Sequence, residues 1–303
     1  MVVNSKVNNF LRQSHQRDKL SQAYLFVGPK DTGKFDTAVD FICLVNNLRN
    51  IEETVKENKN PDIIIVRPEL DNKKKKKKNI SIDQIKGAVK KISYYAYQER
   101  KKFLVILDTE KLSLAAANSL LKNIEEPDAD TIIILIVSNE ERILPTIRSR
   151  CQKVYFNLES QENIEKYLEE KYPQKSKKEI SQVAELSWGR CKMAERLLGD
   201  DILLKEKKDI FDKFRKALKG GVNEGLILTE KLSGDKEKMI EAIQEWVWYL
   251  RIFLKRTISE EQDKEIQKKV FKMIDQLLKV KNRIETSNVN EKLQLENFFV
   301  QIG

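Results

Sequence analysis

The stretch Ala23–Phe35, which reads AYLFVGPKDTGKF, decides the fold of this 303-residue chain. Its first five residues form a continuous apolar run, which is typical of a strand buried on both faces of a parallel sheet. From Gly28 to Lys34 the sequence matches the phosphate-loop pattern G-x-x-x-x-G-K at all seven positions. A buried strand, this loop and a following helix together predict a phosphate-loop α/β fold.

The loop suggests a nucleotide site but lacks one of its parts. Glycines let backbone N–H groups turn toward phosphate oxygens, and the lysine neutralises the outer phosphates, so Gly28, Gly33 and Lys34 are the candidate cofactor-binding residues. The next position should be Ser or Thr, whose hydroxyl coordinates Mg²⁺, but it is Phe35. Two interpretations stay open: nucleotide is held weakly without hydrolysis, or the loop is purely structural and empty.

The acidic element of such ATPases is also incomplete. One Asp after the third strand should hold Mg²⁺, and a following Glu should position the attacking water. The chain offers Leu107-Asp108-Thr109-Glu110, in which only Asp108 directly follows the strand and Thr109 stands beside it. With two elements damaged, we expect no intrinsic ATPase activity.

Further apolar runs in the first half alternate with helical patterns, as in a parallel sheet with helices on both faces. These runs are Ile63–Val66, Phe103–Leu107 and Ile132–Val137. A helix is expected between the last two, with Ser113 as N-cap and Pro127 as its stop. Its buried stripe is expected to contain Ala117, Leu120, Leu121 and Ile124.

After residue 156 the sequence follows helical spacing only. Breaks are expected near Tyr172-Pro173, Gly199-Asp200, Gly220-Gly221 and Ser233-Gly234. We therefore predict an α/β domain at 1–156, a small helical lid domain at 157–205 and a helical C-terminal domain at 206–303. The segment Met239–Lys255 is apolar around much of its circumference, so it is either domain core or a subunit interface.

Composition narrows the function classes. The chain is 40% apolar and 34% charged, has no run of the roughly 18 apolar residues that a membrane helix needs, and starts without a secretion signal. Cys43, Cys151 and Cys191 stand far apart, which argues against disulfides and a Cys-rich zinc site. His15 is the only histidine, so no catalytic triad or His-based metal site can be built. A cytoplasmic location is expected.

The net charge of +10 raises a nucleic-acid hypothesis. Six of the positive charges form the single run Lys73–Lys78. Such a run is typical of a solvated surface loop, and no aromatic residues interleave with it to stack on bases. A DNA or partner contact stays open as the second interpretation.

Several segments together resemble the bacterial clamp-loader subunits of the AAA+ class, in particular the delta-prime type of DNA polymerase III. The densest match includes Ala-Asn-Ser-Leu-Leu-Lys, ending at Lys122, and the Ser-Arg-Cys motif ending at Cys151. The resemblance rests on Ala23–Pro29, Asn60–Asp62, Ile80–Lys86, Lys111–Pro127, Leu144–Cys151 and Asn288–Asn297.

The resemblance implies a role and partners. It implies an AAA+ domain, a lid and a C-terminal collar in a complex with gamma or tau and delta subunits, which loads a sliding clamp onto primed DNA. In this family the arginine of Ser-Arg-Cys reaches into a neighbour's ATP site as an arginine finger, so Arg150 becomes the candidate catalytic residue in trans. A packing or surface ion-pair role for Arg150 stays open.

The sequence also departs from that family. Members usually carry a four-cysteine zinc module before the second strand, but that stretch holds only Cys43, so no zinc is expected. The sensor region around Trp188–Ala194 has no arginine in the expected place, and Lys192 is nearest. The alternatives are a gamma/tau-like motor ATPase, which nucleotide turnover by the pure chain would favour, and a stand-alone basic DNA-binding protein.

Overall fold

The computed structural model describes residues 4–48, 54–55, 57, 59–71, 76–94, 101–126, 130–219, 221–259, 263–287 and 289–302. The chain divides into two compact units. The first contains Met1–Ser176 and Gly189–Met193, and the second contains Lys177–Trp188 and Ala194–Gly303. The prediction of three domains, with boundaries after 156 and 205, stays a prediction.

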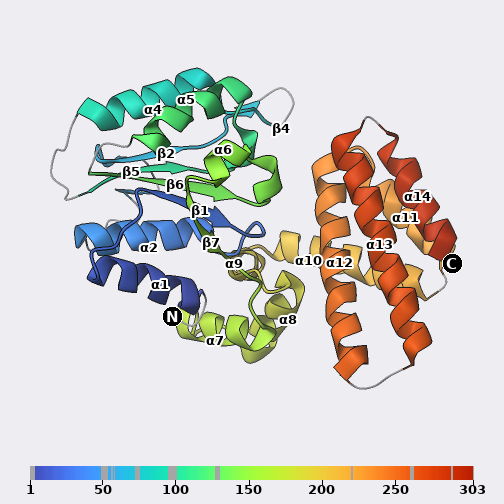
Figure 1. Cartoon of the computed structure of the whole chain (residues 1–303). Helices are drawn as coiled ribbons and strands as arrows, with labels where there is room; N and C mark the ends of the chain where they lie inside the picture. Colours follow the sequence, from blue (N-terminus) through green and yellow to red (C-terminus); the bar gives the residue numbers. More distant parts are fainter. Residues whose placement is uncertain are drawn as a thin grey trace. The chain divides into compact units, whose positions relative to one another are not determined.

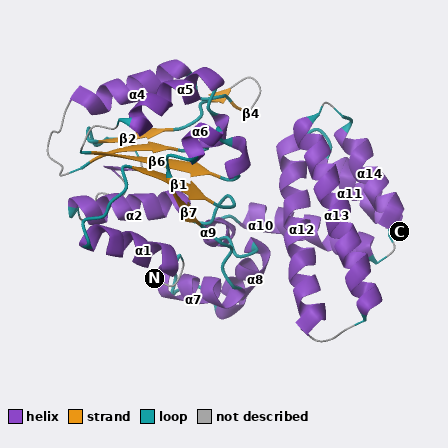
Figure 2. Cartoon of the chain, viewed as in Figure 1, coloured by secondary structure: helices purple, strands orange, loops and turns teal. Residues whose placement is uncertain are grey.

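A five-stranded parallel sheet forms the centre of the first unit (Figure 2). Its strand order is β2-β5-β6-β1-β7. Every residue of β1, β5 and β6 is buried, which explains why these strands read as continuous apolar runs. The strands are β1 (Ala23–Val27), β2 (Ile63–Val66), β5 (Lys102–Ile106), β6 (Thr131–Val137) and β7 (Gln152–Tyr155).

Helices cover both faces of this sheet (Figure 1). Neighbouring side chains of β1 point to opposite faces, so Leu25 joins one apolar cluster while Tyr24 and Phe26 join the other. The predicted fold class is therefore confirmed. One face carries α1 (Ser5–Gln16) and α2 (Lys34–Asn46), and the other carries α4 (Ile82–Tyr94), α5 (Leu114–Glu125) and α6 (Pro145–Arg148).

Helix α5 follows the sequence prediction closely. The Ser113 side chain caps it by accepting a hydrogen bond from the Ala116 N–H at 3.1 Å. Of the predicted stripe, Ala117, Leu120 and Ile124 are buried and Leu121 is partly buried against the same cluster. The helix ends at Glu125, while Pro127 lies outside the described residues.

Short strands differ from the prediction. The edge strand β7 was not predicted, and β5 begins and ends one residue earlier than expected. The loop prediction for Lys73–Lys78 is wrong for Lys76 and Lys77, which form β4 and pair antiparallel with β3 (Leu70–Asp71). Lys78 is exposed, and Lys73–Lys75 lie outside the described residues. Two 3₁₀ turns, η1 (Thr109–Lys111) and η2 (Glu140–Arg142), follow β5 and β6.

The remaining elements are helices, and Figure 2 draws no strand in the described part of the second unit. The predicted breaks fall between them. They are α7 (Gln161–Lys171), α8 (Lys177–Ser187), α9 (Cys191–Gly199), α10 (Asp201–Leu218), α11 (Val222–Leu232), α12 (Lys236–Ser259), α13 (Lys264–Thr286) and α14 (Glu291–Ile302). None of the helices in the described ranges is long and apolar enough to span a bilayer.

Helix α12 provides core and also exposes apolar side chains. Most of its predicted apolar positions, including Ile243, Trp246 and Leu250, are buried in the cluster of the second unit. Phe253 and the adjacent Ile252 are 38% and 45% exposed. The core interpretation is therefore confirmed for the inward face, and the interface interpretation stays a prediction for the outward one.

Candidate functional site

The phosphate loop has the expected place between β1 and α2, and its glycines are required there. A Cβ atom on Gly28 would lie 2.3 Å from the backbone oxygen of Phe156. Gly33 caps α2 with φ of 85°, in the left-handed region that favours glycine. The local geometry thus explains both glycines without any ligand.

The Lys34 side chain is folded back onto its own loop. Its ammonium group donates to the carbonyl oxygens of Gly28 and Pro29, both at 2.5 Å, and the residue is only 6% exposed. In a phosphate loop that binds nucleotide, this ammonium group reaches the outer phosphates. Here two carbonyl oxygens of the protein take the hydrogen bonds that a phosphate would receive.

Burial also changes the proton affinity of Lys34. Desolvation lowers its pKa from 10.5 to about 8, because the buried site disfavours the charged form. The nearby carboxylates of Glu110, Asp31 and Asp108 oppose this shift. The loop therefore contains a poorly solvated cation whose charge is only partly compensated.

Two further contacts hold the loop from outside. The Asn4 side-chain amide donates to the carbonyl oxygen of Thr32 at 2.9 Å. The Asn4 amide nitrogen and the Cys191 sulfur would each lie 3.1 Å from a Cβ atom built on Gly33. Residues that are far apart in sequence thus pack tightly over the start of α2.

Lys192, the residue nearest to the missing sensor arginine, also binds this region. Its backbone N–H donates to the carbonyl oxygen of Asp31 at 2.9 Å. Its ammonium group forms an ion pair with Asp36 in the first turn of α2 at 3.0 Å. Lys192 therefore ties the start of α9 to the phosphate loop through contacts within the protein.

Phe35 takes part in the core. The half-buried ring packs against the apolar cluster that contains Phe26 and Val39. The position that would supply a hydroxyl to Mg²⁺ thus supplies apolar contact area. Converting this site into a magnesium ligand would remove that packing.

The acidic segment after β5 is bound locally. Asp108 adopts φ of 48°, and the Thr109 hydroxyl donates to the carbonyl oxygen of Ile106 at 2.9 Å. One oxygen of Glu110 accepts from the Ser138 N–H at 3.1 Å, directly after β6. Its other oxygen is buried and has no hydrogen-bond partner among the described residues. Sequence reasoning missed that Glu110 lies between two strand ends.

Arg150 lies at the surface after α6. Its Nε atom forms an ion pair with Glu125 at 2.9 Å, and its Nη1 atom donates to the carbonyl oxygen of Thr146 at 3.0 Å. The Arg150 side chain is 41% exposed. Its ion pairs and hydrogen bonds to described residues do not include the phosphate loop, so this chain keeps its two candidate sites separate.

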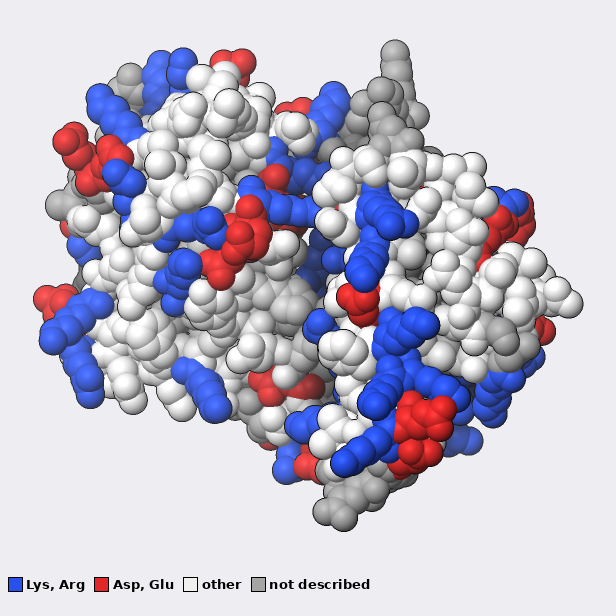
Figure 3. All heavy atoms as spheres, turned by 45° about the vertical axis from the view of Figure 1, so that its right-hand side comes forward, with Lys and Arg blue, Asp and Glu red and all other residues white. Residues whose placement is uncertain are grey.

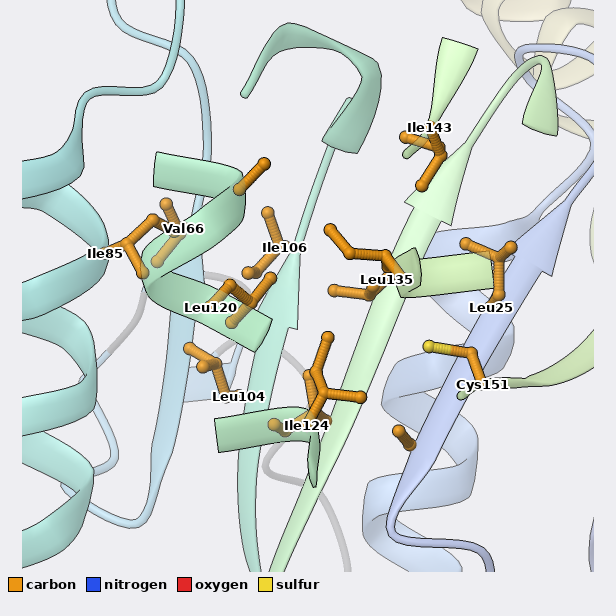
Figure 4. Close-up of a cluster of buried hydrophobic side chains, with 14 of the residues drawn as sticks. Leu25, Val66, Ile85, Leu104, Ile106, Leu120, Ile124, Leu135, Ile143 and Cys151 are labelled. Atoms are coloured by element: carbon orange, nitrogen blue, oxygen red, sulfur yellow. The ribbon is translucent and has the colours of Figure 1, made fainter. Parts of the chain in front are cut away.

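The neighbouring Cys151 anchors this segment. Figure 4 shows its side chain directed into the buried cluster that includes Leu25 and Leu135. Burial raises the pKa of the Cys151 thiol to about 12. Ser149, on the other side of Arg150, is exposed and donates to the carbonyl oxygen of Thr146 at 3.1 Å. The motif thus places one residue in the core and presents the arginine outward.

The described residues show where candidate metal ligands lie and how charge is distributed on one face. Within those ranges no group of three His, Cys, Asp or Glu side chains could hold a metal ion, and no disulfide joins Cys43, Cys151 and Cys191. On the face shown in Figure 3, acidic side chains lie among the Lys and Arg side chains. That face does not present a surface of one sign.

Comparison with known proteins places the chain among replication proteins. Residues 3–160, more than half of the chain, match the family model described as DNA polymerase III, delta subunit. The delta-prime subunit of Bacillus subtilis is 35% identical over 50% of this chain but only 46% of its own length. The delta-prime subunit of Pseudomonas aeruginosa is 26% identical over 80% of this chain and 76% of its own.

A solved structure supports the fold over the whole length. It is a gamma-subunit-related protein from Thermotoga maritima, with a TM-score of 0.52 and 19% identity, covering 97% of this chain and 98% of that one. At this identity the likeness concerns the fold.

Proposed function

Because this chain belongs to the DNA polymerase III delta-subunit family, we propose that it is a delta-prime subunit of a clamp loader that does not itself hydrolyse ATP. It would assemble with gamma or tau and delta subunits, and the complex would place a sliding clamp onto primed DNA. The names of the relatives support this role. The observation that carries the non-hydrolysing part is that the Lys34 ammonium group is bound to the Gly28 and Pro29 carbonyl oxygens of its own loop.

Three features of the loop and of the acidic segment after β5 oppose hydrolysis. Hydrolysis of a nucleotide needs a lysine free to reach the phosphates, a hydroxyl for Mg²⁺ and an acid that positions water. Lys34 is bound to loop carbonyls, Phe35 is packed in the core and Glu110 holds a backbone N–H. Each group that would serve the reaction thus has another role in the folded chain.

In this proposal Arg150 acts on the ATP bound by a neighbouring subunit. A guanidinium stabilises the charge that spreads over a transferring phosphoryl group, and its removal typically lowers the rate by about 10³–10⁵. The side chain is half exposed, lies just after the short helix α6, and is followed by a residue that is buried in the core. These features suit a residue that must reach another protein.

The deciding experiment is DNA-stimulated ATP turnover by a loader reassembled with its motor subunits. We expect Arg150→Ala to abolish hydrolysis at the one site it serves while the complex stays assembled by size-exclusion chromatography. Arg148→Ala is the matched control, since Arg148 lies two residues away and pairs with Glu141 within the chain.

Other outcomes assign other functions. Unchanged turnover with Arg150→Ala in an intact complex would make this arginine a local ion-pair residue. Turnover by the isolated chain would favour the motor ATPase instead. The proposal that this chain is a loader subunit would be refuted if the chain did not assemble with the other subunits.

A further inference from the structure

The Arg150 guanidinium is held at two of its three nitrogens. A guanidinium carries five N–H donors in a fixed planar fork. Nε lies 2.9 Å from a Glu125 oxygen, and Nη1 lies 3.0 Å from the Thr146 carbonyl oxygen and 3.4 Å from the Ser149 hydroxyl. Among the described residues, none bonds to Nη2. Two of the three nitrogens are therefore bonded within the chain, and the N–H groups of Nη2 have no bonding partner among the described residues.

Both sides of this clamp are built on fixed elements. Glu125 is the last residue of α5, one position after the buried Ile124. Thr146 belongs to α6, next to the buried Ile147. A clamp between two helix ends packed on the same apolar cluster can orient a long side chain, because its own parts are not free to move.

The ion pair contributes little to folding. The side chains of Arg150 and Glu125 are 41% and 47% exposed, and exposed ion pairs of this kind stabilise a fold only weakly. Its larger effect is to restrict the conformations of the Arg150 side chain. A free arginine side chain has many rotamers, and a ligand that meets it already ordered does not have to restrict them.

We propose that Glu125 is the positioning residue of the Arg150 finger. It holds Nε so that Nη2 faces away from the chain, toward the γ-phosphate of a nucleotide in the neighbouring subunit. This inference rests on the proposed function of Arg150. Glu125 itself touches neither nucleotide nor phosphate and acts only through the arginine.

The position of Glu125 sets the expected kinetic signature. A finger acts mainly on the charge that develops in the transition state, so loss of its orientation lowers kcat and kcat/KM together and leaves KM for ATP unchanged. We expect kcat to fall about twofold to fivefold, because a loss of that size corresponds to the energies of exposed ion pairs.

The experiment uses full-length chains in the reassembled loader, with turnover measured on primed DNA. Glu125→Ala is expected to lower kcat about twofold to fivefold, and Glu125→Gln less, because an amide oxygen can still accept from Nε. Glu126→Ala is the matched control: Glu126 is the next residue and is exposed, and its one hydrogen bond within the described part of the chain runs from its backbone N–H to the Lys122 carbonyl oxygen. It should leave kcat unchanged.

A double-mutant cycle separates this inference from the function beneath it. With Arg150→Ala in place, Glu125→Ala should cause no further loss, because its effect passes through the arginine. The same loss in both backgrounds would make Glu125 a structural residue and overturn the inference. A rise in turnover, or a change in KM alone, would also overturn it.

The two proposals can fail separately. If Arg150→Ala leaves turnover unchanged, the finger itself is wrong. If Arg150→Ala lowers turnover while Glu125→Ala and Glu125→Gln do not, the finger stands and only the positioning role of Glu125 is refuted. Size-exclusion chromatography checks that every variant still assembles, so that a loss of turnover cannot be ascribed to misfolding.

Discussion

Replacement of Lys34 by methionine tests whether burial of the charged Lys34 side chain in the phosphate loop lowers the free energy of unfolding. Burial lowers the Lys34 pKa from 10.5 to about 8. At 1.36 kcal/mol for each pKa unit, the charged form is disfavoured in the fold by about 3 kcal/mol. Methionine has a similar length and no charge, so the variant loses this penalty together with the bonds to the Gly28 and Pro29 carbonyls.

The pH dependence distinguishes the penalty from the bonds. The folded chain releases the Lys34 proton near pH 8, whereas the unfolded chain keeps it until about 10.5. Between these values the unfolded state binds more protons, so the free energy of unfolding rises with pH, and below about pH 8 this lysine contributes no slope. The free energy of unfolding of the wild type minus that of Lys34→Met should therefore increase by about 3 kcal/mol from pH 8 to 10.5.

Urea unfolding followed by circular dichroism measures this difference. The difference is needed because Cys151 has the opposite effect: its pKa is raised from 9.0 to about 12, so its stabilisation is lost as pH rises from about 9 to 12. That contribution is the same in both proteins and cancels. Tryptophan fluorescence is an internal control that reports on the second unit, where Trp188, Trp246 and Trp248 all lie, whereas Lys34 lies in the first unit.

Nucleotide provides the last arm of the test. A phosphate bound at Lys34 would favour its charged form and move the rise in stability to higher pH. We expect the curves with and without Mg²⁺-ATP to coincide. A difference that stays flat between pH 8 and 10.5 would refute the argument, since Lys34 would then be as well solvated in the fold as in the unfolded chain.

Two substitutions test the local geometry. Gly28→Ala should lower the free energy of unfolding by about 3 kcal/mol, because its Cβ would lie 2.3 Å from the Phe156 carbonyl oxygen, and an unchanged thermal midpoint would contradict this. Ser113→Ala should cost about 1 kcal/mol through loss of the α5 cap, whereas Ser113→Gly should cost only a few tenths if capping is the cause.

The parts of the fold that could be predicted from the sequence are those in which all residues of an element have the same surroundings. Strands β1 and β6 are buried on both faces, so their sequences are apolar throughout. Strand β7 was missed because it lies at the sheet edge, where Lys153 and Tyr155 are exposed and only Val154 is buried. Its place depends on pairing with β1, which no local pattern encodes.

The candidate site shows the same limit. Gly28, Gly33 and Lys34 were found because the loop pattern is contiguous, but that pattern describes a lysine that meets phosphate. It does not predict a lysine that turns back onto its own carbonyls. The pairing of Arg150 with Glu125 joins the last residue of α5 to the segment after α6, so only the tertiary structure could reveal it.

The strand order of the sheet has a consequence for synthesis on the ribosome. β1 is made early, but its two neighbours in the sheet are β6 and β7, which begin at Thr131 and Gln152. At about 5–20 residues per second, the fully apolar Ala23–Val27 segment waits roughly 5–20 s before its first partner strand is made. During this interval the nascent chain exposes an aggregation-prone strand, which makes it a natural client for chaperones that bind at the ribosome exit.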